Sequence, residues 1–400
     1  MDLRHPSAVV TGCLLGLAST PACEAIVGIE DRVVSTTSYD AGTSTASGGS
    51  TGTGGSAGAG GSTGTGGAAG GGGAPAPCTD GPYGIEGFYF GAPVLEPTFN
   101  VDPDPAWCPS NGPVNGGGHV SPDGLRFIQN RGGTGDPACC GGCFRQVEFV
   151  RSSLDDDWST AIAVKFLQSY WVGQWIFLDN LGLMGCHGGD MSCAFYARQS
   201  AAQGWPYGYG PDPDHFAFNT LPAFSGTAAD QEFAPTPDGR WIVFASNRVS
   251  AVDDSAVGGP AAQDLWLGAA VDTPASGPID PTKGYEALQH LTTASSPDFA
   301  DMPAWISDDA RTIVFSTRRL PDDGFDLHVT TRSDAASSFG PAVKLSAASV
   351  DGADEDSFSM PSVATLAAHG GRGFATFRRT VVAPAFTFYR MPVCLGSPDP

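Results

Sequence analysis

From about residue 85 onward, apolar side chains occur in short runs separated by segments rich in glycine, proline and aspartate. Two of these runs, Trp241–Phe244 and Thr312–Phe315, combine β-branched and aromatic residues, as is typical of buried strands. Turn residues bound the runs on both sides. The pattern therefore predicts an all-β fold.

The same short pattern recurs along this region. Residues 119–131, 232–248 and 303–318 align with one another, and residues 361–379 form a fainter fourth copy. Each copy predicts a short apolar strand, a tight turn and a stronger returning strand. In the two clearest copies proline sets φ, aspartate tolerates the next turn position and glycine closes the turn. The predicted turn residues are Pro122, Asp123, Gly124, Pro237, Asp238, Gly239, Asp308 and Asp309.

Two more strands are expected after each turn unit. Residues 144–149, 264–267 and 326–329 would be the third strands, and residues 288–291 and 339–345 would be outer strands. Four antiparallel strands that recur about every 60 residues cannot bury both faces alone, but they can when stacked radially. The sequence therefore predicts a β-propeller of five four-stranded blades, with six blades or a non-closing β-sandwich as alternatives.

The long gap between the first two clear copies leaves room for one degenerate blade. Residues 171–177 and 193–196 are expected to be its middle strands. At the start of the domain, Phe90–Leu95 resembles the outer strand at 339–345, whereas the last blade, residues 361–393, supplies only three strands. We expect the N-terminal strand to complete that blade, closing the ring and bringing Cys78 close to Cys394.

The N-terminal segment reads as an export signal. Residues 1–23 contain a basic residue, an apolar run too short to span a bilayer, and small residues before Cys23. This ending resembles a bacterial lipobox, which predicts acylation of Cys23, with Cys13 or an ordinary secretory signal as alternatives. Residues 24–77 are dominated by Gly, Ser and Thr and are expected to form a disordered tether, and residues 78–400 to form the propeller.

The turn sequence, the apolar strand that ends in Asn-Arg or Thr-Arg, and the later Asp-Leu-Trp or Asp-Leu-His resemble the TolB-type propeller repeat over residues 87–393. The anchor, the tether and the segment Ile26–Arg32 are similar to those of predicted lipoproteins of myxobacteria. The resemblance implies an outer membrane lipoprotein that faces the periplasm or the cell surface. The small N-terminal α/β domain of TolB has no counterpart here, because the tether occupies that region.

The remaining cysteines are even in number and are expected in an oxidising compartment, so disulfides are predicted with open connectivity. The disulfide candidates are Cys78, Cys394, Cys108, Cys139, Cys140, Cys143, Cys186 and Cys193. Some of their spacings could pass for metal ligands, but zinc motifs are usually two clean ligand pairs in reducing compartments. No metal site is predicted.

The net charge of the chain restricts the classes of partner that it is expected to bind. The chain has 42 acidic and 20 basic residues and a formal net charge of −22. A phosphate backbone or an anionic lipid surface would be repelled, so no nucleic-acid partner is expected, and membrane attachment is expected only through a lipid. The acidity is interpreted mainly as solubilising surface charge.

Catalytic motifs were sought in the folded part. It contains no Gly-x-Ser-x-Gly motif, and His119, Ser121 and Asp123 flank one turn, whereas a triad is assembled from distant segments. No cofactor-binding motif was found, and the acidic run at 351–356 lacks regular calcium-loop spacing. No catalytic or cofactor-binding residue is therefore predicted.

Several carboxylate residues leave an enzyme as an alternative function. Five-bladed propellers include glycosidases that use two or three carboxylates near the axis, although aspartates at such places also cap turns. The candidates are Asp179, Asp214, Asp230, Asp301 and Asp356. The sequence thus favours a binding or scaffolding module for a protein, peptide or glycan, with a glycoside-active enzyme as the alternative.

Overall fold

The computed structural model describes residues 77–100, 114–132, 144–159, 162–164, 174–177, 182–186, 192–197, 219–220, 230–248, 263–271, 284–296, 299–319, 324–382 and 385–396. They all belong to one unit, Gly73–Pro400. The signal, Cys23 and the predicted tether lie outside the described residues. Within the described part, no helix is both long enough and apolar enough to cross a membrane.

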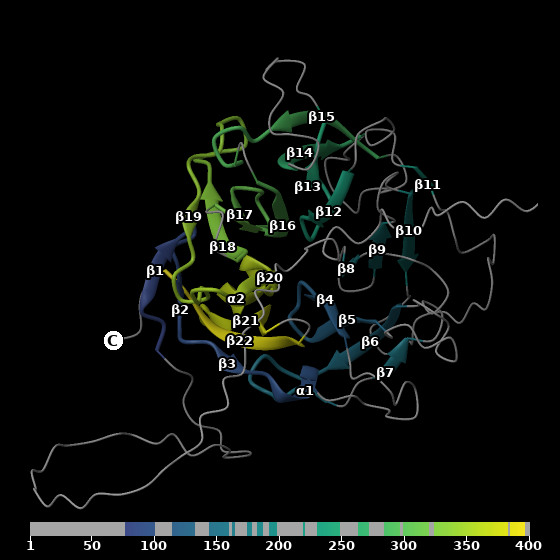
Figure 1. Ribbon diagram of the computed structural model, residues 1–400, viewed down its shortest axis with the longest axis vertical. Helices are drawn as coiled ribbons and strands as arrows, with labels where there is room; N and C mark the ends of the chain where they lie inside the picture. The colour runs from purple at the N-terminus through teal and green to yellow at the C-terminus, as the bar shows by residue number, and fades with distance from the viewer. Residues whose placement is uncertain are drawn as a thin grey trace, which may run out of the picture. The chain divides into compact units, whose positions relative to one another are not determined.

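The described strands form five separate antiparallel sheets (Figure 1). Four of them have four strands each, connected in sequence order. They are β4 (Val114–Val120), β5 (Arg126–Gly132), β6 (Phe144–Val150) and β7 (Ile162–Val164); β8 (Gln174–Phe177), β9 (Gly182–Cys186), β10 (Ser192–Ala197) and β11 (Asn219–Thr220); β12 (Asp230–Pro235), β13 (Trp241–Ser246), β14 (Asp264–Ala270) and β15 (Tyr285–His290); and β16 (Asp301–Ile306), β17 (Thr312–Thr317), β18 (Asp326–Thr331) and β19 (Val343–Lys344).

The fifth sheet combines both ends of the domain. It contains β1 (Asp80–Tyr83), β2 (Phe88–Phe90), β3 (Val94–Leu95), β20 (Asp354–Ser359), β21 (Arg372–Val382) and β22 (Ala385–Leu395). Its order is β1-β2-β22-β21-β20, with β3 also paired to β22, so the predicted pairing of the N-terminal segment with the last strands is confirmed. Five equal four-stranded blades were expected, but this sheet has six strands because the N-terminal segment contributes three short strands rather than one.

A disulfide joins Cys78, just before β1, to Cys394 in β22. The turn between β1 and β2 also contacts the sheet that begins with β16: the Thr312 hydroxyl donates a hydrogen bond to Glu86 Oε2 (2.5 Å). In the connection that follows β19, the Ala347 amide donates to Asp80 Oδ2 (2.6 Å). The N-terminal strands are therefore fastened both to β22 and to the neighbouring sheet.

The sheets are arranged as a β-propeller. The first strand of each four-stranded sheet and β20 lie nearest the centre of the unit, and β7, β15 and β19 lie toward its outside (Figure 1). Among these inner strands β4 contacts β8, β8 contacts β12, β12 contacts β16, β16 contacts β20, and β20 contacts β4. We call the line they surround the axis.

The turns that follow the inner strands β4, β12 and β16 share one hydrogen-bond pattern. After β16, the Ser307 hydroxyl donates to Asp309 Oδ1 (2.7 Å) and accepts from the amides of Arg311 (3.1 Å) and Thr312 (2.9 Å). Asp309 in turn accepts from the Arg311 amide (3.1 Å). The same pattern recurs with Ser121 and Asp123 after β4, and with Thr236 and Asp238 after β12. The turn aspartates therefore serve the fold.

Asp308 stands where the other two turns carry proline. Its two carboxylate oxygens accept hydrogen bonds from the amides of Val363 (3.2 Å) and Ala364 (3.1 Å), at the start of helix α2 (Val363–Ala368). The helix fills the connection between β20 and β21. The prediction that residues 361–379 begin with the first strand of the last blade was therefore wrong, because β20 precedes that helix.

Two other strand assignments need correction. Within the segment 171–177, the described strand β8 is the inner strand of its sheet rather than a middle one, and β9, which the sequence analysis missed, is the second. The predicted outer strand at 339–345 is reduced to the two residues of β19. Cys186 of β9 and Cys193 of β10 are partners in the backbone register of the two strands. Cys108, Cys139, Cys140 and Cys143 lie outside the described residues.

Aromatic side chains fill the spaces between sheets. A short helix, α1 (Pro97–Asn100), places Phe99 against Phe127 at 4.0 Å between ring centroids, and Phe388 of β22 closes the cluster at 5.5 Å from Phe127. Phe88 of β2 packs edge-on against Trp305 of β16 at 5.9 Å. The N-terminal segment is thus part of the hydrophobic core as well as of the sheet.

Candidate functional site

The inner strands β4, β12 and β16 can be compared position by position because they end at the same kind of turn, and β20, which α2 follows instead, is aligned with them through the sequence repeat. Four residues before the start of each turn, the strand carries a different residue in each described copy. These residues are Gly117, Glu232, Pro303 and Ser357. A Cβ atom placed on Gly117 would lie 3.0 Å from Ser357 Oγ, so these two of the four positions meet. Glu232 is the only charged side chain among the four.

Glu232 has a left-handed backbone, which it shares with Ser357 at the aligned position of β20 (φ at 52°), and an unusual environment. It sits in a bulge between the paired residues Gln231 and Phe233, with φ at 43°, in the left-handed region that is costly for a residue with a side chain. Its side chain is partly buried, and its carboxyl group makes no hydrogen bond or ion pair with another described residue. Burial, together with the charge of Asp356, raises the pKa of Glu232 to about 7.

Asp356 and Arg378 form a bidentate ion pair between β20 and β21. Arg378 Nε donates to Asp356 Oδ1 (2.6 Å) and Arg378 Nη2 to Asp356 Oδ2 (2.5 Å). The arginine is 6% exposed, and its guanidinium lies over the Phe386 ring at 4.0 Å. The corresponding pairs in two other sheets are neutral: Met302 with Ser316, and Gln231 with Ala245.

We call Glu232, Asp356 and Arg378 the axial cluster. Glu232 belongs to the sheet of β12, whereas the ion pair belongs to the six-stranded sheet, and the sheet of β16 contacts both. The charges of Asp356 and Arg378 act on the Glu232 carboxyl group although they belong to a different sheet. A partnerless carboxyl group beside a fixed ion pair can accept hydrogen bonds or a positive charge from a ligand.

His119 lies between the axial cluster and the turns. Two positions nearer the turn than Gly117, its imidazole Nε2 is 3.3 Å from the Ala304 carbonyl oxygen, and its Nδ1 is 3.3 Å from Ser359 Oγ. These contacts join three inner strands. The side chain is buried, and desolvation lowers the pKa of His119 to about 4, so the ring is neutral near pH 7. This histidine is therefore a structural bridge between β4, β16 and β20.

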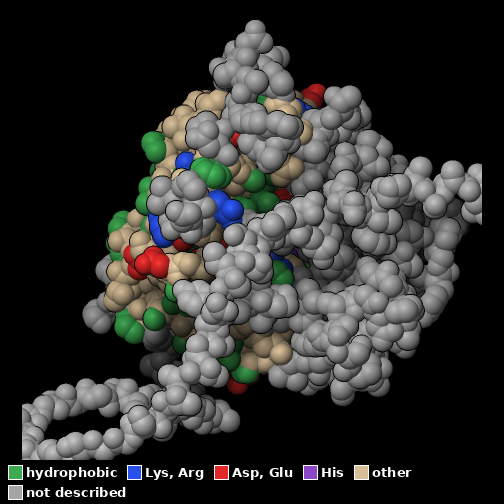
Figure 2. All heavy atoms as spheres, in the orientation of Figure 1, with side chains coloured by type: hydrophobic (Ala, Val, Ile, Leu, Met, Phe, Trp, Pro, Cys, Tyr) green, Lys and Arg blue, Asp and Glu red, His purple; other side chains and the backbone are tan. Residues whose placement is uncertain are grey.

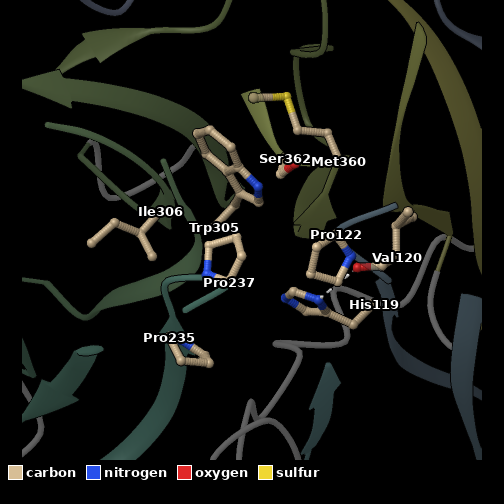
Figure 3. A pocket seen from close by; sticks show the side chains of 9 residues that line it. All are labelled: His119, Val120, Pro122, Pro235, Pro237, Trp305, Ile306, Met360 and Ser362. Atoms are coloured by element: carbon tan, nitrogen blue, oxygen red, sulfur yellow. Dashed lines mark hydrogen bonds between the residues drawn. The ribbon is translucent and has the colours of Figure 1, made fainter. Parts of the chain in front are cut away.

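A pocket opens on the turn side of His119 (Figure 3). It encloses about 300 Å³ including its open mouth, and the rings of Pro122, Pro237 and Trp305 lie around it. The other lining residues are Val120, Pro235, Ile306, Met360 and Ser362. Most of these side chains are buried core residues of the inner strands. The lining is apolar and offers few groups for orienting a polar ligand.

The structure separates the predicted carboxylate candidates from one another. Asp356 lies in the axial cluster, and Asp230 is the first residue of β12. Asp301 is fully buried, and its Oδ2 accepts a hydrogen bond from the Ser296 amide (2.6 Å), so it supports the loop before β16. Burial raises the pKa of Asp301 to about 7. Asp179 and Asp214 lie outside the described residues.

Sequence reasoning missed Glu232 and Arg378. Both lie inside aligned repeat copies, but the predictions came from the residues that the copies share. The signal was available in the differences: a glutamate where another copy has proline, and an arginine where the others have serine or alanine. In a repeat protein such departures at one position are expected at functional or strained sites.

Within the part of the chain that the structure describes, no three His, Cys, Asp or Glu side chains are placed to hold a metal ion.

Charged side chains of both signs lie on the face drawn in Figure 2, where basic groups gather near β17 and β18 and acidic groups lie beside them. The surface is locally mixed although the formal net charge is −22.

No family model and no curated protein matches the chain. Among solved structures, a protein of unknown function from Dyadobacter fermentans is 9% identical with a TM-score of 0.40, covering 78% of this chain and 100% of its own. A mannose phosphorylase from Leishmania mexicana is 10% identical with a TM-score of 0.38, covering 70% of this chain and 84% of its own. A putative 6-phosphogluconolactonase from Bacteroides fragilis is 13% identical with a TM-score of 0.28, covering 59% and 56%.

Proposed function

We propose that this chain is a lipid-tethered TolB-type propeller of the bacterial envelope or cell surface, which binds a protein, peptide or glycan at its axial cluster. The single observation that carries the binding role is the Glu232 carboxyl group. It is kept partly buried and makes no hydrogen bond or ion pair with a described residue, which costs folding free energy. Groups held at such a cost are concentrated at binding sites and active sites.

The binding role is tested with an array of peptides and glycans. Wild-type protein is expected to bind at least one array member, and Glu232→Gln is expected to weaken that binding. Glu286→Gln is the matched control, because Glu286 is an exposed residue of the outer strand β15 and the substitution removes the same charge. If no array member binds, or if the two variants bind alike, the axial cluster is not a ligand site.

The proposed ring has five blades, with the six-stranded sheet as the fifth. The contacts among the inner strands and the pairing of β2 and β3 with β22 support this reading. The Cys78–Cys394 disulfide would then close a loop with a sequence separation of 316 residues. Chain-entropy models assign such a link about 5 kcal/mol. We expect the double variant Cys78→Ser, Cys394→Ser to lower the melting temperature strongly, and an unchanged melting temperature would contradict closure through this link.

The lipid anchor is supported by the signal-like segment that ends at Cys23 and by the Gly/Ser/Thr-rich segment after it. Palmitate labelling of the protein in a bacterial host tests it. Labelling is expected in the wild type and absent from Cys23→Ala. Labelling that survives in Cys23→Ala would move the anchor to Cys13, and the absence of labelling in the wild type would mean a freely secreted protein.

A glycoside-active enzyme is the second candidate function. It is favoured by one observation: Glu232, with a pKa of about 7, lies near the ion-paired Asp356, and glycosidases use two carboxyl groups in different protonation states. Hydrolysis of a member of the glycan array by the wild type, lost in both Glu232→Gln and Asp356→Asn, would replace the binding proposal by this one. Binding without hydrolysis would eliminate it.

A further inference from the structure

The pocket beside His119 is built by the turn ends of four inner strands. β4, β12 and β16 contribute to it, and residues just after β20 complete it. Pro122 and Pro237 are half-buried turn residues, whereas Trp305 and Met360 are buried. None of the described lining side chains is charged near pH 7, because desolvation lowers the pKa of His119 to about 4. The pocket therefore suits a neutral, apolar group.

Trp305 supplies the one uncommitted hydrogen-bond donor among the described side chains that line the pocket. Its indole nitrogen faces into the pocket and makes no hydrogen bond with a described residue (Figure 3). Both imidazole nitrogens of His119 have partners. The Ser362 hydroxyl accepts from the Thr365 amide (3.1 Å) and donates to Thr365 Oγ1 (3.0 Å). These side chains thus offer a ligand one donor but leave the ligand's own donors without a strong partner.

The size of the pocket limits what can enter it. At about 300 Å³ including its mouth, it lies at the lower end of the roughly 300 to 1,000 Å³ that small-molecule sites enclose. It can take one side chain of a longer ligand, but so few contacts cannot offset the entropy cost of ordering a flexible chain. A ligand that is already extended before it binds avoids most of this cost.

A proline in an extended segment meets all these conditions. Its ring is neutral and apolar and can lie against the flat rings of Pro122, Pro237 and Trp305. The peptide group before it has a carbonyl acceptor and no N–H, so its burial leaves no donor unsatisfied. Proline-rich segments adopt the polyproline II conformation before binding, and aromatic-lined grooves recognise them. A glycan would instead bring hydroxyl donors that this pocket does not satisfy.

We propose that this pocket is a second binding site of the chain, which takes a proline residue of an extended, proline-rich segment of a partner protein. The ring enters between Pro122, Pro237 and Trp305, and the carbonyl group that precedes it accepts a hydrogen bond from Trp305 Nε1. Glu232 is not among the lining residues, so this site is independent of the ligand proposed for the axial cluster.

The test uses N-acetylated, C-amidated hexaproline and hexaglycine as probes, with titration calorimetry of the full chain. The wild type is expected to bind hexaproline and to bind hexaglycine at least tenfold more weakly. Trp305→Phe keeps an aromatic ring but removes the N–H, and it is expected to lose at least fivefold in affinity for hexaproline. Trp158→Phe is the matched control, because Trp158 packs against Phe99 and does not line the pocket, and it should lose less than twofold.

The indole N–H signals of ¹⁵N-labelled protein give a direct readout by NMR. The signal that is absent from Trp305→Phe is expected to shift when hexaproline is added to the wild type. The signal that is absent from Trp158→Phe is expected to stay in place. Melting curves check that both variants are folded. Should Trp305→Phe not fold, the comparison of the two peptides on the wild type still decides.

Equal binding of hexaproline and hexaglycine, or equal affinity of the two variants for hexaproline, would overturn the proposal. A wild type that binds no hexaproline would overturn it as well. A Trp305 signal that shifts with protein concentration, and not with added peptide, would assign the pocket to a second copy of this chain instead. None of these outcomes bears on the axial cluster, which the peptide and glycan array tests separately with Glu232→Gln.

Discussion

The two ends of the inner strands differ in how closely the repeat copies resemble one another. At the turn end, three copies place the same hydroxyl and the same carboxylate in the same hydrogen bonds, and each polar group of the pattern has a partner. At the axial cluster the copies differ, and Glu232 has neither a hydrogen bond nor an ion pair to a described residue. The comparison teaches that what the repeats share builds the fold, and that what one copy alone carries marks the site.

We expect substitutions at the turn end to destabilise the fold more than substitutions at the axial cluster. Gly124 has φ at 71°, and a Cβ atom there would lie 2.4 Å from Leu154 Cδ2 and 2.8 Å from Pro361 Cγ. We expect Gly124→Ala to lower the free energy of unfolding by about 3 kcal/mol, through backbone strain and overpacking together. Gly352→Ala is the control, because Gly352 has φ at 73° but open space around its Cβ position.

Urea unfolding of both glycine variants measures this difference. The control should lose only the strain, about 1 kcal/mol. If the free energy of unfolding falls by the same amount in both variants, packing of the turn against Leu154 and Pro361 does not contribute to stability. The turn end would then tolerate substitutions as well as an open glycine position does.

Removing the fixed part of the axial cluster should also be costly. Asp356→Asn would leave Arg378, which is 6% exposed, without its bidentate carboxylate. We expect a loss of about 2 to 3 kcal/mol, because a buried charge that loses its partner remains desolvated. Asp351→Asn, at an exposed position before β20, should change stability by less than about 0.5 kcal/mol. A loss below 1 kcal/mol in Asp356→Asn would mean that the ion pair is not a fixed element of the site.

A single shared turn hydroxyl should have a smaller effect. Ser307→Ala removes one hydrogen bond to Asp309 and two from the amides of Arg311 and Thr312. We expect a loss of about 1 to 2 kcal/mol in thermal unfolding, since the amides of a buried turn lose their acceptor. The exposed Ser333→Ala serves as the control. Indistinguishable melting temperatures would show that the shared pattern is dispensable in this copy.

The turns could be predicted because their signal is short-range. Proline, aspartate and glycine at fixed offsets determine the local conformation, and the hydrogen bonds follow within five residues. The pairing of the N-terminal segment with β22 was also predictable, because a three-stranded last blade needs an edge partner. The number of strands that this segment would contribute was not, because Phe88–Phe90 and Val94–Leu95 are too short to be recognised as separate strands.

The other features that the sequence did not predict also have physical causes. In the fourth copy, a helix replaces the tight turn, and its N-terminal amides are capped by Asp308 from another sheet, a long-range contact that local pattern cannot reveal. Glu232 looked like an ordinary position at the start of a strand. Its proposed role depends on the charges of Asp356 and Arg378, which are more than a hundred residues away in sequence and act on it only in the folded chain.

The most direct test of the account is the stability of Glu232→Gln relative to the wild type as a function of pH. The carboxyl group holds its proton up to a pKa of about 7 in the folded chain, against 4.5 as its ordinary value. The folded state therefore binds more protons between these values, and the wild type loses stability as pH rises from about 4.5 to about 7. Gln cannot ionise, so the variant should escape this loss.

The measurement is urea unfolding of both proteins at pH 5 and pH 8. We expect nearly equal stability at pH 5 and a variant that is more stable than the wild type by about 1 to 2 kcal/mol at pH 8. A variant that is less stable than the wild type at pH 8 would contradict the central claim, because it would show that the Glu232 carboxylate serves the fold and is not held in reserve for a ligand.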